Sequence, residues 1–189
     1  VWGLLTLHQK LREVRDRQTR LRLPQLTTGL GLALGPVIAG ALTAGERCEP
    51  VIVGEGTRSA LRLATAAQRL GTGVLVGGSV ADGLEGDLLA ELRPLGELSG
   101  EAGEPRIPAF ELLAARPPEE QALLKDLRTV WEDALTAYRT GDLQAAEAGF
   151  ARVLTEVRED RPARWFLRQC RLRHGKAEAA PEAETLPLR

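Results

Sequence analysis

Methionine is missing from the sequence and cysteine is scarce, and both features narrow the possible classes of protein. Cys48 and Cys170 lie far apart, and neither has a neighbouring Cys or His that would suggest a pair of metal ligands. We therefore expect no disulfide framework and no zinc site, and we expect a reducing compartment, the cytoplasm. Because the chain begins with Val1 and lacks methionine, we expect a piece of a longer protein rather than a translated non-ATG start.

Long apolar runs and an excess of either charge are also missing. No stretch of about 18 apolar residues occurs, so no membrane-spanning helix is predicted. Lys10 comes too early for the apolar core and cleavage site of a signal peptide. A formal net charge of −1 gives no overall attraction to nucleic acid or to an anionic membrane surface. The composition therefore favours one soluble globular domain, with or without a small appendage.

Strand and helix patterns alternate along residues 1–113. Residues 1–20 carry apolar side chains at helical spacing. Residues 30–34 alternate Leu with Gly or Ala, which predicts a strand with one nearly bare face, where either a helix or a ligand can approach the backbone. A polar connection is expected at residues 41–50. Further strands are predicted at 51–53, 73–78, 91–98 and 106–112, and helices at 57–70 and, capped by Ser79, at 79–89.

A Pro-Pro pair at 117–118 separates this pattern from a helical C-terminal part. Its pattern W-x₆-Y-x₂-G-D-x₃-A-x₃-F, from Trp131 to Phe150, is similar to one tetratricopeptide (TPR) unit. We expect its aromatic residues to form the core of this part. We predict a linker with a helix at 114–127, a TPR-like helical tail at 128–173 and a disordered tail at 174–189. The two histidines, His8 and His174, have no evident partners and are expected at the surface.

Three segments have the order and the spacing of segments in a known protein family. They are GLGLALGPVIAG at 29–40, VIVGEGTRSALRLATAAQ at 51–68 and ELRPLGELSGEAGEPRIPAFEL at 91–112. Together they resemble the C-terminal half of a bacterial class III adenylate/guanylate cyclase domain. The resemblance implies an α+β fold for residues 1–113, a partial ferredoxin-like nucleotidyl-cyclase sandwich in which helices cover a sheet. An all-α TPR-like helix pair would follow it.

The resemblance also implies catalytic positions on the predicted helix at 57–70. In the family an Asn orients the ribose, and an Arg four residues later stabilises charge on the transition-state phosphate. Arg62 matches that Arg, and that spacing places both positions on one helical face. Arg58 stands in place of the Asn, and a guanidinium has no hydrogen-bond acceptor, so it cannot reproduce the role of the amide.

Substrate-binding positions implied by the resemblance are altered as well. Val51 falls where the family selects the purine with Asp or Thr, and valine offers no hydrogen bond to a base. Gly54, which follows this position in the V-[IV]-G pattern, is also expected among the substrate-binding residues. Ser99 falls where the family has a Lys in its closing hairpin, and Glu101 nearby would repel a triphosphate. The choice between ATP and GTP therefore stays open.

In the family, the ligands of the metal ions belong to the other half of the domain. There, two Asp residues hold two divalent ions that activate the attacking hydroxyl and neutralise the phosphates. Those Asp residues precede the segment that this chain matches, so we expect no metal ligand and no cofactor in this chain. Mg or Mn is expected only if the missing N-terminal half is present.

Three functions from different classes are compatible with these observations. The first is a catalytically degenerate cyclase-homology module of a bacterial cyclic-nucleotide signalling protein, acting through dimerisation or partner docking. The second is the C-terminal part of an active adenylate or guanylate cyclase, making a 3′,5′-cyclic nucleotide and pyrophosphate. The third is a TPR-like protein-interaction scaffold. We expect a homo- or heterodimer through the cyclase-like face, because a sheet without its first strands exposes an edge. A protein partner on the helical tail is also possible, and no nucleic acid is expected.

Overall fold

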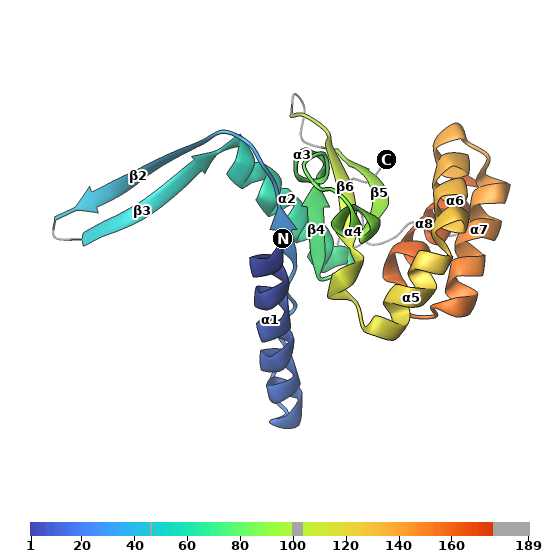
Figure 1. Cartoon of the computed structure of the whole chain (residues 1–189), viewed down its shortest axis with the longest axis horizontal. Helices are drawn as coiled ribbons and strands as arrows, with labels where there is room; N and C mark the ends of the chain where they lie inside the picture. The colour runs from blue at the N-terminus through green and yellow to red at the C-terminus, as the bar shows by residue number, and fades with distance from the viewer. Residues whose placement is uncertain (46, 100–103, 176–189) are drawn as a thin grey trace.

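The computed structural model describes residues 1–45, 47–99 and 104–175, which form an α+β body with two projections (Figure 1). Helix α1 (Trp2–Arg20) extends from the body in one direction. A hairpin of β2 (Val37–Ala44) and β3 (Arg47–Gly54) extends in another. Within the described ranges, no helix has both the length and the apolar character needed to cross a membrane.

The body is built on a mixed four-stranded sheet in the order β1-β4-β6-β5. Its outer strand β1 pairs in parallel with β4, while β4 with β6 and β5 with β6 pair antiparallel. A register shift between Pro94 and Gly96 interrupts the β5–β6 ladder, which accommodates a proline in an edge strand. The strands are β1 (Leu30–Leu32), β4 (Val74–Gly77), β5 (Leu92–Leu98) and β6 (Ile107–Leu112).

Helix α2 (Glu55–Leu70) packs on β1 so closely that two glycines are needed. A Cβ atom at Gly31 would lie 2.1 Å from the carbonyl oxygen of Ala60. One at Gly29 would lie 2.2 Å from that of Ala64, and real side chains do not tolerate either approach. The nearly bare face of the predicted strand is therefore occupied by a helix and not by a ligand.

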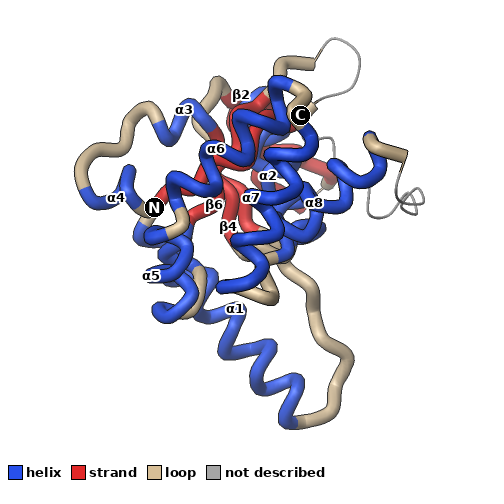
Figure 2. The backbone as a smooth tube through the Cα atoms, turned by 90° about the vertical axis from the view of Figure 1, so that its right-hand side faces the viewer, coloured by secondary structure: helices blue, strands red, loops and turns tan. Residues whose placement is uncertain are grey.

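The helices after the Pro-Pro pair share one core with the sheet, and Figure 2 shows α6, α7 and α8 in front of the strands. Trp131, Phe150 and Phe166 are fully buried, with ring centroids 5.0 to 5.7 Å apart. The indole Nε1 of Trp131 donates to the carbonyl oxygen of Pro94 in β5 over 2.6 Å. These helices are α5 (Pro118–Asp126), α6 (Arg128–Thr140), α7 (Leu143–Glu156) and α8 (Arg161–Arg173).

The predicted strands at 73–78, 91–98 and 106–112 and the helices at 1–20 and 57–70 are confirmed to within a few residues. The prediction of a polar connection at 41–50 is wrong, because residues 41–44 pair with residues 47–50 in the β2–β3 hairpin. Gly45, with a φ of 63°, lies in the turn between the two strands. The prediction of one helix at 79–89 is also wrong. The Ser79 hydroxyl bonds to the backbone of Leu34 instead of capping a helix, and short helices α3 (Gly78–Ala81) and α4 (Asp87–Ala90) replace it.

The C-terminal part is helical as predicted, and a short 3₁₀ helix η1 (Leu113–Ala115) leads into it. Gly141, with a φ of 86°, makes the turn between α6 and α7, and Asp142 caps α7 by accepting from the Ala145 amide over 3.1 Å. The TPR-like character and the domain boundaries stay predictions. The disordered tail predicted at 174–189 lies almost wholly outside the described residues, as does the middle of the closing hairpin at 100–103.

Candidate functional site

Arg62, the candidate transition-state arginine, is bound by its own chain. Its Nη1 donates to the carbonyl oxygen of Pro105 over 3.1 Å, and its Nη2 donates to that of Leu98 over 3.2 Å. The Glu104 carboxylate lies 3.4 Å from Nη1, and the Arg62 side chain is 21% exposed. The guanidinium thus joins α2 to the ends of β5 and β6, and a triphosphate would have to compete with these contacts.

Arg58 lies one turn before Arg62 on α2 but in a different environment. Its side chain is exposed, and the described residues give it neither a hydrogen bond nor an ion pair. Arg58 is therefore a solvated cation on the same helix as Arg62. No contact among the described residues orients it toward Arg62.

Of the altered substrate positions, the structure brings Ser99 close to Arg62. Ser99 directly follows Leu98, whose carbonyl oxygen accepts from Arg62, and the Ser99 hydroxyl is buried with no partner among the described residues. Val51 instead lies on the hairpin, opposite Gly40 of β2. Glu101 is outside the described residues. The roles of these positions in binding a nucleotide stay predictions.

Gly54 has a backbone reason to be glycine. Its φ is 147°, and a Cβ atom there would lie 2.4 Å from the carbonyl oxygen of Pro36. The glycine therefore allows the start of β2 to pass close to the end of β3, where α2 begins. This packing explains part of the VIVGEG segment without a ligand.

The two Asp ligands that the family resemblance implies belong to the other half of the domain, and the expectation for this chain stays a prediction. Within residues 1–45, 47–99 and 104–175, no group of three or more His, Cys, Asp or Glu side chains is arranged to hold a metal ion.

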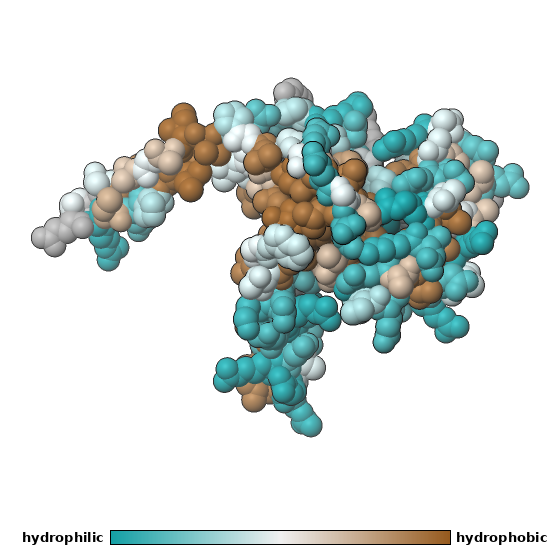
Figure 3. Space-filling view, viewed as in Figure 1, coloured by the Kyte–Doolittle hydropathy of each residue, from teal (hydrophilic) through white to brown (hydrophobic). Residues whose placement is uncertain are grey.

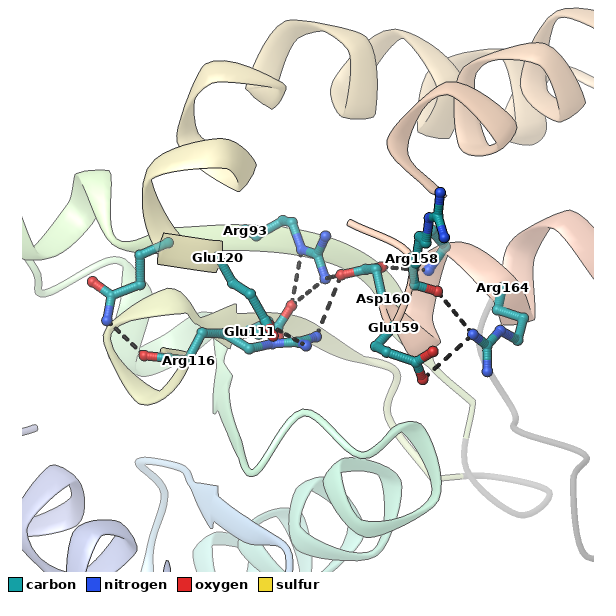
Figure 4. Close-up of polar contacts among 10 residues, drawn as sticks. Arg93, Glu111, Arg116, Glu120, Arg158, Glu159, Asp160 and Arg164 are labelled. Atoms are coloured by element: carbon teal, nitrogen blue, oxygen red, sulfur yellow. Dashed lines mark hydrogen bonds and ion pairs between the residues drawn. The ribbon is translucent and has the colours of Figure 1, made fainter. Parts of the chain in front are cut away.

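A buried ion cluster between the sheet and the tail was not predicted from the sequence (Figure 4). Arg93 of β5 donates from Nε to Glu111 and from Nη2 to Asp160, each over 2.8 Å. Arg116 donates to the other oxygen of Glu111 over 2.6 Å. Glu111 and Asp160 are completely buried and Arg93 is 3% exposed, so the charges are compensated almost entirely by each other.

The cluster holds the C-terminal helices on the sheet. The Asp160 carboxylate also accepts from the Ala163 amide over 2.7 Å, which caps the N-terminus of α8. Burial lowers the pKa of Arg116, but the charges of Glu111 and Asp160 outweigh it and raise that pKa above its ordinary value. The Arg93 guanidinium also lies 4.4 Å from the centre of the Trp131 ring. Asp160 is thus both the cap of α8 and an ionic partner of Arg93 in the sheet.

The β2–β3 hairpin presents apolar side chains on both of its faces. Ile38 is paired with Val53, so the two share one face, while Ile52 lies on the other. Ile38 is 73% exposed, and Figure 3 shows hydrophobic surface on the hairpin where it leaves the body. We name the exposed apolar residues of this hairpin the apolar arm: Val37, Ile38, Leu42, Ile52 and Val53.

Comparisons with known proteins leave the family open. No protein-family model matches this chain, and no curated protein matches it. A solved structure titled "Crystal structure of the guanylyl cyclase Cya2" is similar, with a TM-score of 0.47 and 18% sequence identity. The similarity covers 60% of this chain and 56% of that one, so the chain spans little more than half the length of this relative. Similarity at this level does not assign the chain to a family.

Proposed function

We propose that this chain is a catalytically degenerate cyclase-homology module that pairs with a second copy of itself. The observation that carries the proposal is the apolar arm, which extends away from the body with hydrophobic side chains on both faces. A two-stranded hairpin is marginally stable alone in water, and a large exposed apolar patch marks an interaction surface. The arm therefore needs a cover that one copy of the chain does not supply.

A second copy meets the requirements for that cover. Each copy carries the same arm, so a two-fold axis can place two arms against each other or against the partner's body. The formal net charge of −1 gives little repulsion between copies. Leu34 and Leu61, 63% and 68% exposed, add apolar surface just before β2 and on α2, which contacts both strands of the hairpin. An interface that includes the arm can therefore continue onto the body.

The altered contacts support a role without catalysis. Arg62 is held by two carbonyl oxygens and a carboxylate of its own chain. Arg58 cannot supply the acceptor of the amide it replaces. Val51 has no group that can bond to a base edge, and a site without such a bond discriminates poorly between bases.

Sedimentation velocity over a range of concentrations tests the pairing. The variant Ile38→Lys/Val53→Lys places two charges on one face of the arm, and Leu7→Lys/Val14→Lys is the matched control because these side chains are exposed on α1. We expect dimers of the wild type and the control. The arm variant should be a monomer, with association weakened at least about 100-fold because like charges would meet in the interface. A monomeric wild type, or an arm variant that associates as well as the control, would refute the proposal.

One observation favours an alternative, the C-terminal part of an active cyclase: Arg62, in the middle of α2, donates to the carbonyl oxygen of Leu98, the residue just before Ser99. Isothermal titration with non-hydrolysable analogues of ATP and GTP, each with Mn²⁺, separates the two. Binding that Arg62→Ala abolishes would support the enzyme reading. No binding by the folded chain would support the pairing module.

The scaffold alternative has less support from the helical tail. A groove for a peptide needs exposed apolar anchors, but Trp131, Tyr138 and Phe150 are at most 2% exposed. These aromatic side chains pack against each other and against the sheet. The tail therefore offers little free apolar surface for a partner.

A further inference from the structure

A cavity of about 270 Å³ lies at the C-terminal end of α2, where α1, η1, α5 and the start of α8 meet. Its lining includes four arginines and two glutamates, so its formal charge is +2 with His8 neutral. The cavity includes none of the apolar arm and does not include Arg62. The charged lining residues are Arg12, Arg15, Arg116, Arg161, Glu120 and Glu159.

One face of α1 supplies part of the positive charge. His8, Arg12 and Arg15 follow each other at intervals of four and three residues, so they share a face of the helix. His8 was expected at the surface, but it is partly buried, and a Cβ atom at Gly73 would lie 2.5 Å from its Nε2. Burial lowers the pKa of His8, and the positive charges of Arg12 and Arg15 lower it further.

Helix α8 supplies another cation from across the cavity. The Arg161 side chain lies over Gly71, whose φ of 64° ends α2, and Nη2 of Arg161 donates to the carbonyl oxygen of Arg69 over 3.3 Å. A Cβ atom at Gly71 would lie 2.6 Å from that guanidinium. Arg161 is therefore held close to the end of α2 by a neutral acceptor, and its charge is not compensated by that contact.

The negative groups do not neutralise the three outer arginines. Glu120 lies 3.3 Å from Arg116, which already serves the buried ion cluster. Glu159 is 83% exposed and lies 3.6 Å from Arg164, outside the cavity lining. Within the described parts of the chain, the side chains of Arg12 and Arg15 make no hydrogen bond and no ion pair. The two glutamates therefore leave the lining with a net positive charge.

We propose that this cavity binds a small soluble anion that carries phosphate, of the pyrophosphate or phosphomonoester class. Guanidinium groups match the oxygens of phosphate in bidentate geometry, and they are weakly enough hydrated to bind it in a pocket. The volume is just below the roughly 300–1,000 Å³ of ordinary small-molecule sites, which suits a small ligand. The hydroxyl-bearing residues Thr27 and Thr28 also line the cavity.

Binding would fix α1 on the body. None of the residues of α1 is fully buried, so the helix has little apolar attachment of its own. An anion between Arg12, Arg15 and Arg161 would join α1 to α8 and remove the repulsion among these cations. This inference goes beyond the pairing function, because it uses a different surface and a different ligand.

Isothermal titration of the complete chain with sodium pyrophosphate, at fixed ionic strength, tests the site. The variant Arg12→Gln/Arg15→Gln removes two cavity cations. The matched control Arg17→Gln/Arg20→Gln makes the same charge change on α1 outside the cavity lining. We expect wild type to bind and the cavity variant to bind at least about tenfold more weakly, since each charged hydrogen bond contributes strongly. The control should stay within about twofold of wild type.

A second readout is the His8 imidazole followed by nuclear magnetic resonance. A bound anion offsets the charges of Arg12 and Arg15, so the pKa of His8 should rise when pyrophosphate is added. If the double variant does not fold, Arg161→Gln carries the same expectation from an exposed side chain. No binding by wild type, or equal weakening in the control, would overturn the proposal. So would association only with vesicles that contain phosphatidylinositol phosphate.

Discussion

Nη2 of Arg62 donates a hydrogen bond to the carbonyl oxygen of Leu98 over 3.2 Å, and this contact joins α2 to the end of β5. Arg62, the candidate transition-state arginine, therefore has a structural role in the fold. A side chain with this role should affect stability when it is removed, whether or not the chain binds a nucleotide.

Arg62→Ala should lower the free energy of unfolding by about 1–2 kcal/mol, because two backbone carbonyls lose a charged donor at a partly buried position. Arg58→Ala is the control on the same helix face and should change it by less than about 0.5 kcal/mol, since that side chain is exposed. Urea denaturation followed by circular dichroism measures both. Equal effects of the two substitutions would show that Arg62 is not a structural link.

Asp160→Ala should be much more destabilising than Asp142→Ala, although both residues cap a helix. Asp142 is exposed, so its loss should cost about 1 kcal/mol. Asp160 is completely buried beside Arg93, so its loss leaves a buried cation undercompensated and should cost about 3–5 kcal/mol. Chemical denaturation of the two variants gives the comparison. Similar losses would mean that the ion cluster contributes nothing beyond the cap.

Gly31→Ala should severely destabilise the chain, because the new Cβ atom would be 2.1 Å from the Ala60 carbonyl oxygen. We expect a loss of at least about 3 kcal/mol or failure to fold. Gly40→Ala, in the same glycine-rich segment, has nothing within 4 Å of its Cβ position and should be nearly neutral. Thermal unfolding of both proteins tests this. If both were tolerated, α2 would not pack on β1 as described.

The two cysteines should differ in reactivity toward a disulfide reagent. Cys48 is exposed, whereas Cys170 is buried, and burial together with the Glu147 charge raises the pKa of its thiol to about 11. Because the thiolate is the reactive form, Cys170 should stay slow as pH rises from about 7 to 9. The fast phase should vanish in Cys48→Ser and both thiols should react in denaturant. Two equally fast thiols in the folded chain would contradict the buried position of Cys170.

Local periodicity was enough to predict most of the body. The strand at 91–98 and the helix at 57–70 have clear apolar patterns, and both occur close to their predicted positions. The sequence pattern did not predict the hairpin, because a polar connection is the usual interpretation of a segment that contains Thr43, Gly45 and Glu49. Strand pairing between residues 37–44 and 47–54 satisfies the backbone there, and local composition does not report that pairing.

Contacts between distant residues account for the rest of what the sequence did not predict. Arg93 and Asp160 are 67 positions apart, so their pairing follows from how the tail docks on the sheet. His8 reaches its partly buried place only because Gly73 leaves space beside the end of α2. Among the candidate site residues, Arg62 contacts Leu98, the residue before Ser99. Val51 lies instead on the β2–β3 hairpin, where it pairs with Gly40.

The most direct measurement of pairing through the apolar arm is the distance between nitroxide labels attached to Cys48. This cysteine lies on β3, opposite Thr43, and it is exposed while Cys170 is buried, so labelling is selective. Pairing predicts a dipolar coupling between chains that grows with protein concentration and disappears in Ile38→Lys/Val53→Lys. Absence of coupling in a chain that sediments as a dimer, or persistent coupling in that variant, would contradict the account.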